Sequence, residues 1–280
     1  MGLGDTRSDP SSISMNAILR PTVPCTRRAA IRDAARATAA LALGGCVGTS
    51  FPEEPATARD DGRLAVAVTP ATSRAAPGTT ALGLGDVRDG QLFVPAAADG
   101  GAPMPLALLL HGAGQDSNVL LQPMRPLAES LGLALLAVDS RGSTWDISRD
   151  GGFGADVAFI ERALTHAFAH VAVDPTRLTV AGFSDGASYA ISLGTVNGDL
   201  LRRIAAFSPG YWHRRPPHGT PPLFITHGQN DGVLPIDVTS RRLVPDLRAS
   251  GYDVTYTEFA GGHAITRALL EQATRCLAGD

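Results

Sequence analysis

The chain has 280 residues, a hydrophobic content of 44% and a formal net charge of −3 at pH 7. This length suits one domain with an extension, or two small domains, and the hydrophobic content is enough for a large core. The slightly acidic balance gives no electrostatic footprint for nucleic acid. The cysteines form no CxxC or Cys/His cluster, so we expect neither a metal site nor a disulfide framework; they are Cys25, Cys46 and Cys276.

Residues 1–47 have the pattern of an export signal. The basic pair Arg27-Arg28 precedes an apolar stretch over 37–47, which ends in small residues. This order is typical of export signals, and the arginine pair resembles a twin-arginine signal. The stretch is too short to span a bilayer, which needs about 20 residues. We therefore expect an exported protein, periplasmic or in the cell envelope, with a cytoplasmic location as the alternative.

The end of this segment, Leu43-Gly44-Gly45-Cys46, resembles a bacterial lipoprotein box. In such a box Cys46 would be lipidated and would become the mature N-terminus, so we expect membrane anchoring through the lipidated N-terminus. The alternative is a disordered Ala/Arg-rich tail with a chance cysteine. The charges of Asp33 and Arg36 close to the apolar stretch favour that alternative.

Residues 48–80 are rich in Pro, Ala, Thr and Arg, and Pro52 and Pro55 interrupt any regular element. This composition predicts a flexible linker ahead of a catalytic domain over 81–280. The sequence leaves open whether translation starts at Met1 or Met15, and it leaves the oligomeric state open.

From residue 81 onward, short apolar runs alternate with stretches of helical spacing. Residues 155–168 place Val157, Ile160, Leu164 and Phe168 on one helical face. Strands that are apolar throughout, separated by helices, predict an α/β fold with a mostly parallel sheet and helices on both faces. Ligands bind such sheets at the carboxyl ends of the strands. The expected strands are 91–94, 106–110, 133–138, 178–181, 204–207, 223–226 and 254–259, and the last helix spans about 264–278.

The strand 178–181 leads directly into Gly182-Phe183-Ser184-Asp185-Gly186. A serine on a tight strand-to-helix turn has strained backbone angles and an exposed hydroxyl. Side chains at positions 182 and 186 would collide there, which explains the glycines Gly182 and Gly186. The pattern is short and the chain is glycine-rich, so its significance depends on its place after a strand and on partners downstream.

Serine needs a neighbouring base, normally a histidine oriented by a carboxylate. Asp231 follows the strand 223–226, and His263 follows the strand 254–259. Asp237, which we expect to cap a helix, and Asp253, which opens a strand, are the weaker candidates for the acid. The other histidines compete less well for the base, because they lie on a helix, in a polar loop or before a glycine; they are His111, His166, His170, His213, His218 and His227.

Acyl transfer also needs hydrogen-bond donors for the developing oxyanion. The backbone N–H of Asp185 follows the nucleophile, and a second donor should come from the loop 111–114, most favourably Ala113. An ordinary tight turn and a phosphate loop are the alternatives for this glycine-rich loop. Neither Gly-Lys-Ser/Thr nor G-x-G-x-x-G accompanies it, so nucleotide binding is poorly supported.

Five motifs together resemble the α/β-hydrolase superfamily over about residues 85–280, and within it the small bacterial phospholipase/carboxylesterase group. The resemblance implies an α/β-hydrolase fold without a cofactor, with Ser184 as nucleophile, Asp231 as acid, His263 as base, and Ala113 and Asp185 as oxyanion donors. Thioesterases of that group usually carry Gln after the nucleophile, so Asp185 weighs against acyl-protein thioesterase activity. The motifs are His111–Asp116, Gly182–Ala187, Ser208–Gly210, His227–Asp231 and Gly261–His263.

The loop 211–222 is too short for a large lid, which weighs against long-chain lipase action. Trp145, Tyr211 and Trp212 either wall the pocket or pack under covering loops. We expect a serine carboxylic-ester hydrolase that acts on small or short-chain acyl esters through an acyl-enzyme intermediate. The alternatives are a peptidase or amidase, a polyhydroxyalkanoate depolymerase-like hydrolase on the same fold, and a non-catalytic surface lipoprotein.

Overall fold

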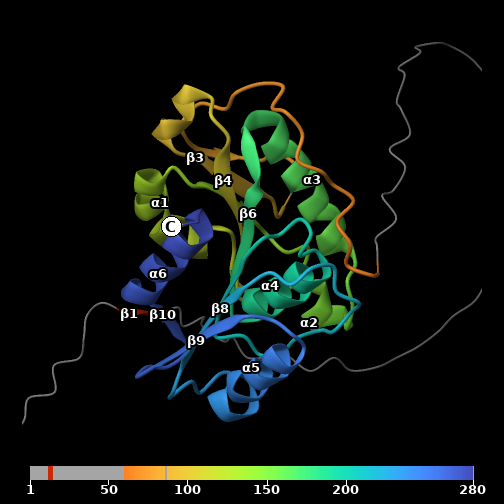
Figure 1. The fold of residues 1–280 in the computed structure, drawn as a ribbon, viewed down its shortest axis with the longest axis vertical. Coiled ribbons are helices and arrows are strands. Elements are labelled where there is room, and N and C mark those ends of the chain that lie inside the picture. The colour runs from red at the N-terminus through yellow and green to blue at the C-terminus, as the bar shows by residue number, and fades with distance from the viewer. Residues whose placement is uncertain (1–11, 15–59, 86, 280) are drawn as a thin grey trace, which may run out of the picture. The chain divides into compact units, whose positions relative to one another are not determined.

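A computed structural model describes residues 12–14, 60–85 and 87–279. Eight strands form one sheet in the order β2-β3-β5-β4-β6-β7-β8-β9 (Figure 1). Strands β2 and β3 pair antiparallel at one edge, and all pairs from β5 to β9 are parallel. The bounds are β2 Gly78–Ala81, β3 Gly90–Val94, β4 Met104–Leu110, β5 Ala134–Val138, β6 Val173–Phe183, β7 Ile204–Phe207, β8 Leu223–Gly228 and β9 Val254–Phe259.

Helices cover both faces of this sheet, which confirms the predicted architecture. One face packs against α1 (Asn118–Leu131) and α6 (Arg267–Ala278), on the left of the sheet in Figure 1. The other packs against α3 (Ala155–His170), α4 (Asp185–Val196) and α5 (Ser240–Ala249). The sheet is therefore buried on both sides, as its continuously apolar strands require.

Strand β4 contributes side chains to the apolar cores on both faces of the sheet. Leu106, Leu108 and Leu110 belong to the core under α3 and α4, whereas Ala107 and Leu109 belong to the core under α1 and α6. All five side chains are at most 1% exposed. Because successive strand residues point to opposite faces, a strand between two helical layers must be apolar at every position.

Shorter elements complete the chain. They are η1 (Ala96–Gly100), α2 (Asp146–Asp150), η2 (Ile236–Val238) and the antiparallel pair of β1 (Ser12–Ser14) with β10 (Ala264–Thr266). Among the described residues, no helix has the length and apolar character that a membrane span requires.

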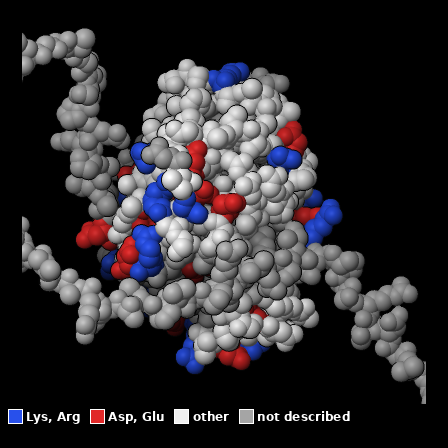
Figure 2. Space-filling model, turned by 180° about the vertical axis from the view of Figure 1, so that it is seen from behind, with Lys and Arg blue, Asp and Glu red and all other residues white. Residues whose placement is uncertain are grey.

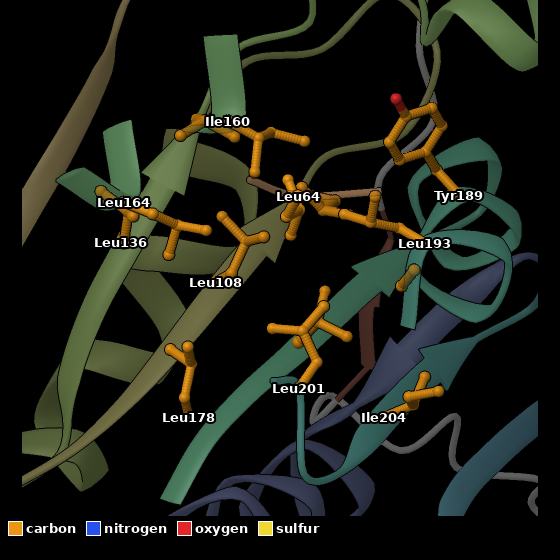
Figure 3. Packing of buried hydrophobic residues seen from close by; sticks show 14 of the residues in the cluster. Leu64, Leu108, Leu136, Ile160, Leu164, Leu178, Tyr189, Leu193, Leu201 and Ile204 are labelled. Atoms are coloured by element: carbon orange, nitrogen blue, oxygen red, sulfur yellow. The ribbon is translucent and has the colours of Figure 1, made fainter. Parts of the chain in front are cut away.

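Residues 60–81 make specific contacts with the domain, although we expect a linker over 48–80. The Arg63 guanidinium pairs with the Asp199 carboxylate at 2.8 Å, and the Leu64 N–H donates to Asn197 Oδ1 at 2.9 Å. Figure 3 shows the Leu64 side chain within the apolar cluster that contains Ile160 and Leu193. The contacts of Arg63 and Leu64 thus fix part of a segment whose composition predicts a flexible linker.

The remaining N-terminal predictions, which are the export signal over 1–47, lipidation at Cys46 and the linker over 48–59, lie outside the described residues apart from β1.

Charged side chains on the surface are intermixed. Figure 2 shows basic and acidic groups next to one another on the face that it presents. Pairs such as Arg241 with Glu258 at 2.6 Å and Arg214 with Asp246 at 2.9 Å contribute to this pattern.

Candidate active site

The nucleophile turn has the strained geometry that its sequence predicts. Ser184 lies between β6 and α4 with φ 56° and ψ −120°. A Cβ added at Gly182 would lie 2.0 Å from the Gly186 carbonyl oxygen, and one added at Gly186 would lie 2.1 Å from the Leu110 carbonyl oxygen. A non-glycine residue at such angles costs about 1–3 kcal/mol, which the surrounding packing must offset. Both glycines are therefore required by close backbone approach.

Ser184, His263 and Asp231 are joined by hydrogen bonds. The His263 Nε2 lies 2.9 Å from Ser184 Oγ, and its Nδ1 lies 2.6 Å from Asp231 Oδ2. The three residues follow β6, β9 and β8, so they meet at the carboxyl edge of the parallel strands. With these partners, Ser184 donates its hydroxyl proton to Nε2, and the Nδ1–H donates to the carboxylate.

Backbone hydrogen bonds hold the Asp231 carboxylate in place independently of His263. Its side chain is fully buried, and Oδ1 accepts hydrogen bonds from the N–H groups of Val233 at 2.9 Å and Leu234 at 2.8 Å. The His263 ring also contacts the Phe183 ring, with 4.9 Å between the centroids. These contacts leave the imidazole one orientation in which it links the carboxylate to the hydroxyl.

The loop 111–114 runs alongside the nucleophile. A Cβ added at Gly112 would lie 3.3 Å from the Ser184 Cβ. Within the described part of the chain, the backbone N–H groups of Ala113 and Asp185 make no hydrogen bond, and Asp185 opens α4. Unpaired donors at a helix N-terminus beside a serine hydroxyl suit a developing negative charge. The two predicted oxyanion donors thus flank Ser184, and their role stays a prediction.

No protein-family model matches the chain. Esterase FrsA of Yersinia pestis (strain Pestoides F) is 28% identical over 119 residues, which cover 41% of this chain. Esterase FrsA of Yersinia pseudotuberculosis (strain YPIII) matches to the same extent. The chain spans only 27% of the length of these curated relatives.

Solved structures match over more of the chain. Esterase PE8 is 25% identical, with a TM-score of 0.55 over 68% of this chain and 97% of that one. A Bacillus cereus carboxylesterase is 20% identical, with a TM-score of 0.52 over 68% and 93%. The S-formylglutathione hydrolase FrmB from Staphylococcus aureus is 14% identical, with a TM-score of 0.56 over 73% and 97%. The chain has the α/β-hydrolase fold.

Within this α/β-hydrolase fold, a buried pair of rings supports the loop 111–114. The His111 Nδ1–H donates to the Gly112 carbonyl at 2.7 Å, and Nε2 accepts from the Ser140 N–H at 2.9 Å. Burial lowers the pKa of His111, which keeps the imidazole neutral with this tautomer. The Trp145 Nε1–H donates to the His111 carbonyl at 2.7 Å. Trp145 is 0% exposed, so it packs beneath the loop and does not wall an open pocket.

The connection between β5 and α3 is the part of the site that sequence reasoning missed. The Thr144 hydroxyl donates to Asp185 Oδ2 at 2.7 Å, and the Ser143 carbonyl accepts from the Gly114 N–H at 2.7 Å. This segment therefore joins the nucleophile turn to the loop 111–114. The only sequence signal for it is a cluster of polar and aromatic residues after the strand 133–138.

Two buried aspartates within this connection accept hydrogen bonds from each other's backbone N–H groups. The Asp146 N–H donates to Asp156 Oδ2 at 2.7 Å, and the Asp156 N–H donates to Asp146 Oδ2 at 2.9 Å. Each aspartate is 1% exposed. Desolvation raises the pKa of both carboxyls, that of Asp156 to about 6. The pair holds the two ends of the segment 146–156 together.

Tyr211 and Trp212 lie in a segment that contains no helix or strand between β7 and β8, as expected for a fold without a large lid. Both residues are half-buried. The Tyr211 hydroxyl lies 2.6 Å from Ser148 Oγ, and the Trp212 Nε1–H donates to Thr195 Oγ1 at 3.1 Å. Tyr211 therefore borders the connection between β5 and α3, whereas Trp212 packs against α4.

The remaining candidates lie apart from the hydroxyl of Ser184. His166 and His170 stack on α3 with ring centroids 4.3 Å apart. Asp237 lies inside η2 and pairs with Arg241 of α5, so it does not cap a helix. A cavity of about 710 Å³, bordered by Arg74, Met104 and other residues, lies at the opposite, amino edge of the sheet. Neither feature belongs to the hydrogen-bonded site.

Proposed function

We propose that the protein is a serine carboxylic-ester hydrolase that cleaves small or short-chain acyl esters through an acyl-enzyme intermediate. The observation that carries this proposal is the hydrogen-bond chain from Ser184 Oγ through His263 to Asp231. The N–H groups of Ala113 and Asp185, which have no hydrogen-bond partner in the described part of the chain, lie in the two segments next to Ser184. The esterases among the similar proteins support the same reaction class.

In the first half of the reaction, Ser184 Oγ attacks the ester carbonyl carbon while His263 Nε2 takes the hydroxyl proton. The N–H groups of Ala113 and Asp185 donate to the carbonyl oxygen as it becomes negative. The carbon–oxygen bond to the alcohol then breaks, and His263 returns the proton to the leaving alkoxide. Asp231 remains ionised throughout and stabilises the imidazolium. An acyl-Ser184 ester and a free alcohol result.

In the second half, a water molecule attacks the acyl carbon and gives its proton to His263 Nε2. The bond to Ser184 Oγ breaks, and that oxygen regains the proton from His263. The net reaction consumes one ester and one water and yields one carboxylic acid and one alcohol. The short segment 211–222 supports small substrates, because no helical lid stands between β7 and β8 to enclose a long acyl chain.

The test uses the purified full chain with p-nitrophenyl butyrate and a fluorophosphonate probe. Ser184→Ala should lower kcat by about 10⁴-fold or more and abolish probe labelling. Ser130→Ala, which changes an exposed serine on α1, should behave as wild type in both assays. Unchanged turnover or labelling in Ser184→Ala would refute the proposal. Faster cleavage of the matching p-nitroanilide would favour the amidase alternative.

We also propose that the chain is exported and anchored through a lipidated Cys46. The support is the sequence pattern alone, with its arginine pair, apolar stretch and Leu-Gly-Gly-Cys ending. In a bacterial host, Cys46→Ser should move the protein from the membrane fraction to the soluble fraction, whereas Cys25→Ser should not. Retention of Cys46→Ser in the membrane fraction would exclude lipidation as the anchor.

A further inference from the structure

The residue after the nucleophile places a carboxylate next to the reacting centre. Asp185 is partly exposed, and its Oδ2 accepts a hydrogen bond from the Thr144 hydroxyl at 2.7 Å. Within the described residues, no arginine or histidine nitrogen lies within 4.0 Å of this carboxylate. The group therefore carries a negative charge that no neighbouring cation pairs with directly.

Thr144 ties this carboxylate to the segment that supports the predicted oxyanion loop. Its neighbours on both sides contact the loop that would hold the oxyanion: Ser143 accepts from Gly114, and Trp145 donates to His111. The Asp185 side chain is thus held by the same short segment that supports the oxyanion loop. A substrate carbonyl bound beside Ser184 would lie close to this carboxylate.

A half-buried phenol and a second carboxylate lie near Asp185. Tyr211 has its pKa raised to about 12, chiefly by burial and further by the carboxylates of Asp185 and Asp146. The Arg149 guanidinium donates to the Thr144 carbonyl at 3.2 Å but pairs with Asp150 at 2.6 Å. Its charge is therefore largely offset by its own partner.

A carboxylate in this place disfavours a second negative charge and favours a positive one, because opposite charges attract most strongly where solvent is partly excluded. We propose that Asp185, with the hydroxyls of Thr144, Ser148 and Tyr211, forms a subsite for a cationic group. The preferred substrates would be esters that carry an ammonium group, and esters with a second carboxylate would be rejected. This inference rests on the proposed ester hydrolase function and adds the substrate class.

The test compares esters that differ in charge but match in shape. On the alcohol side, butyrylcholine is compared with its uncharged isostere 3,3-dimethylbutyl butyrate. On the acyl side, p-nitrophenyl 4-trimethylammoniobutyrate is compared with the 5,5-dimethylhexanoate and with the glutarate monoester. In at least one series kcat/KM should be about fivefold higher for the cation than for the neutral ester, and the glutarate should be the poorest acyl substrate.

Asp185→Asn keeps an oxygen that can accept from Thr144 and removes the charge. The cation-to-neutral ratio of kcat/KM should fall to about 1 in this variant, and the ratio cancels any general loss of turnover. Glu271→Gln, which removes a surface carboxylate paired with Arg267 on α6, should leave the wild-type ratio unchanged. Raising the salt concentration to 1 M should lower the wild-type ratio, since the Debye length falls to about 3 Å.

The two proposals fail in different ways. If wild type neither hydrolyses the neutral esters nor reacts with the fluorophosphonate probe, the proposed ester hydrolase function is wrong. The proposed cationic subsite is then wrong as well. If the neutral esters are hydrolysed but both ratios are near 1 in wild type, only the cationic subsite is wrong. A preference that persists in Asp185→Asn would likewise overturn the assignment to Asp185.

Discussion

The buried imidazole of His227 contacts the same carboxylate oxygen as His263: its Nε2 lies 3.2 Å from Asp231 Oδ2. The same nitrogen lies 2.8 Å from the Leu234 carbonyl, and Nδ1 lies 2.7 Å from the Ser240 hydroxyl. Burial lowers the pKa of His227, so the ring is neutral and Nε2 carries the proton. The Nε2–H therefore donates to the Leu234 carbonyl, and its positive end also lies next to Asp231, where it partly offsets the negative charge that faces His263.

We expect His227→Leu to lower kcat/KM for p-nitrophenyl butyrate by about tenfold, because Asp231 loses the polar N–H beside it and the Leu234 carbonyl loses its donor. The midpoint of the acid limb of the pH–rate profile should also rise, because a less neutralised carboxylate stabilises the His263 imidazolium. His227→Gln, which restores an N–H donor, should return both values most of the way to wild type. A lower rate with an unmoved midpoint would mean that His227 acts only in packing.

The proposed base requires His263 to be neutral before Ser184 can transfer its proton. Activity on p-nitrophenyl butyrate should therefore rise with pH between about pH 5 and 8, over the range in which histidine ordinarily loses its charge. Measuring kcat/KM across this range at constant ionic strength checks the expectation. A flat profile, with the chemical step shown to limit the rate, would count against a histidine base.

The nucleophile turn should not tolerate a methyl group at position 186. In Gly186→Ala the new Cβ would meet the backbone oxygens of Leu110 at 2.1 Å and His111 at 2.4 Å, and the buried end of β4 cannot move easily away from α4. We expect a loss of about 3 kcal/mol or more in the free energy of unfolding, measured by urea denaturation. Gly152→Ala is the matched control, because nothing lies within 4 Å of its added Cβ. It should change stability by less than about 0.5 kcal/mol.

The buried carboxyl of Asp156 should make stability depend on pH. The folded chain retains this proton up to about pH 6, whereas an unperturbed aspartate releases it near 3.8. Between these values the folded state binds more protons than the unfolded state, so stability from this group falls as pH rises from about 4 to 6. The full effect is on the order of 3 kcal/mol.

Urea denaturation of wild type and Asp156→Asn at several pH values between 4 and 7 isolates this contribution. The variant cannot ionise at this position, so the difference in unfolding free energy should shift in its favour as pH rises. A constant difference across that range would show that Asp156 does not exchange its proton there. Asp150→Asn, which changes an exposed carboxylate nearby, serves as the control.

Local sequence patterns predict a large part of the fold and of the candidate site. The apolar run 204–207 coincides with β7, because a strand buried on both faces needs an apolar residue at every position, and the alternating run 254–259 coincides with the more exposed strand β9. Gly182 and Gly186 revealed the tight turn, because only glycine fits such close backbone approach. Ser184, Asp231 and His263 could be chosen because each follows a strand, and parallel strands end at one edge.

Other features depend on which residues meet across long stretches of sequence, and only the tertiary structure decided them. The sequence left open whether Trp145 walls a pocket or packs under a loop, and the structure buries it with the His111 carbonyl as its partner. Leu64 lies in a segment with the composition of a linker, yet it fits between α3 and α4. The contact of Thr144 with Asp185 likewise has no local signal. Composition and periodicity indicate which face of a helix or strand is apolar. They do not indicate which residues of distant segments come into contact, because those contacts form only when the elements pack together.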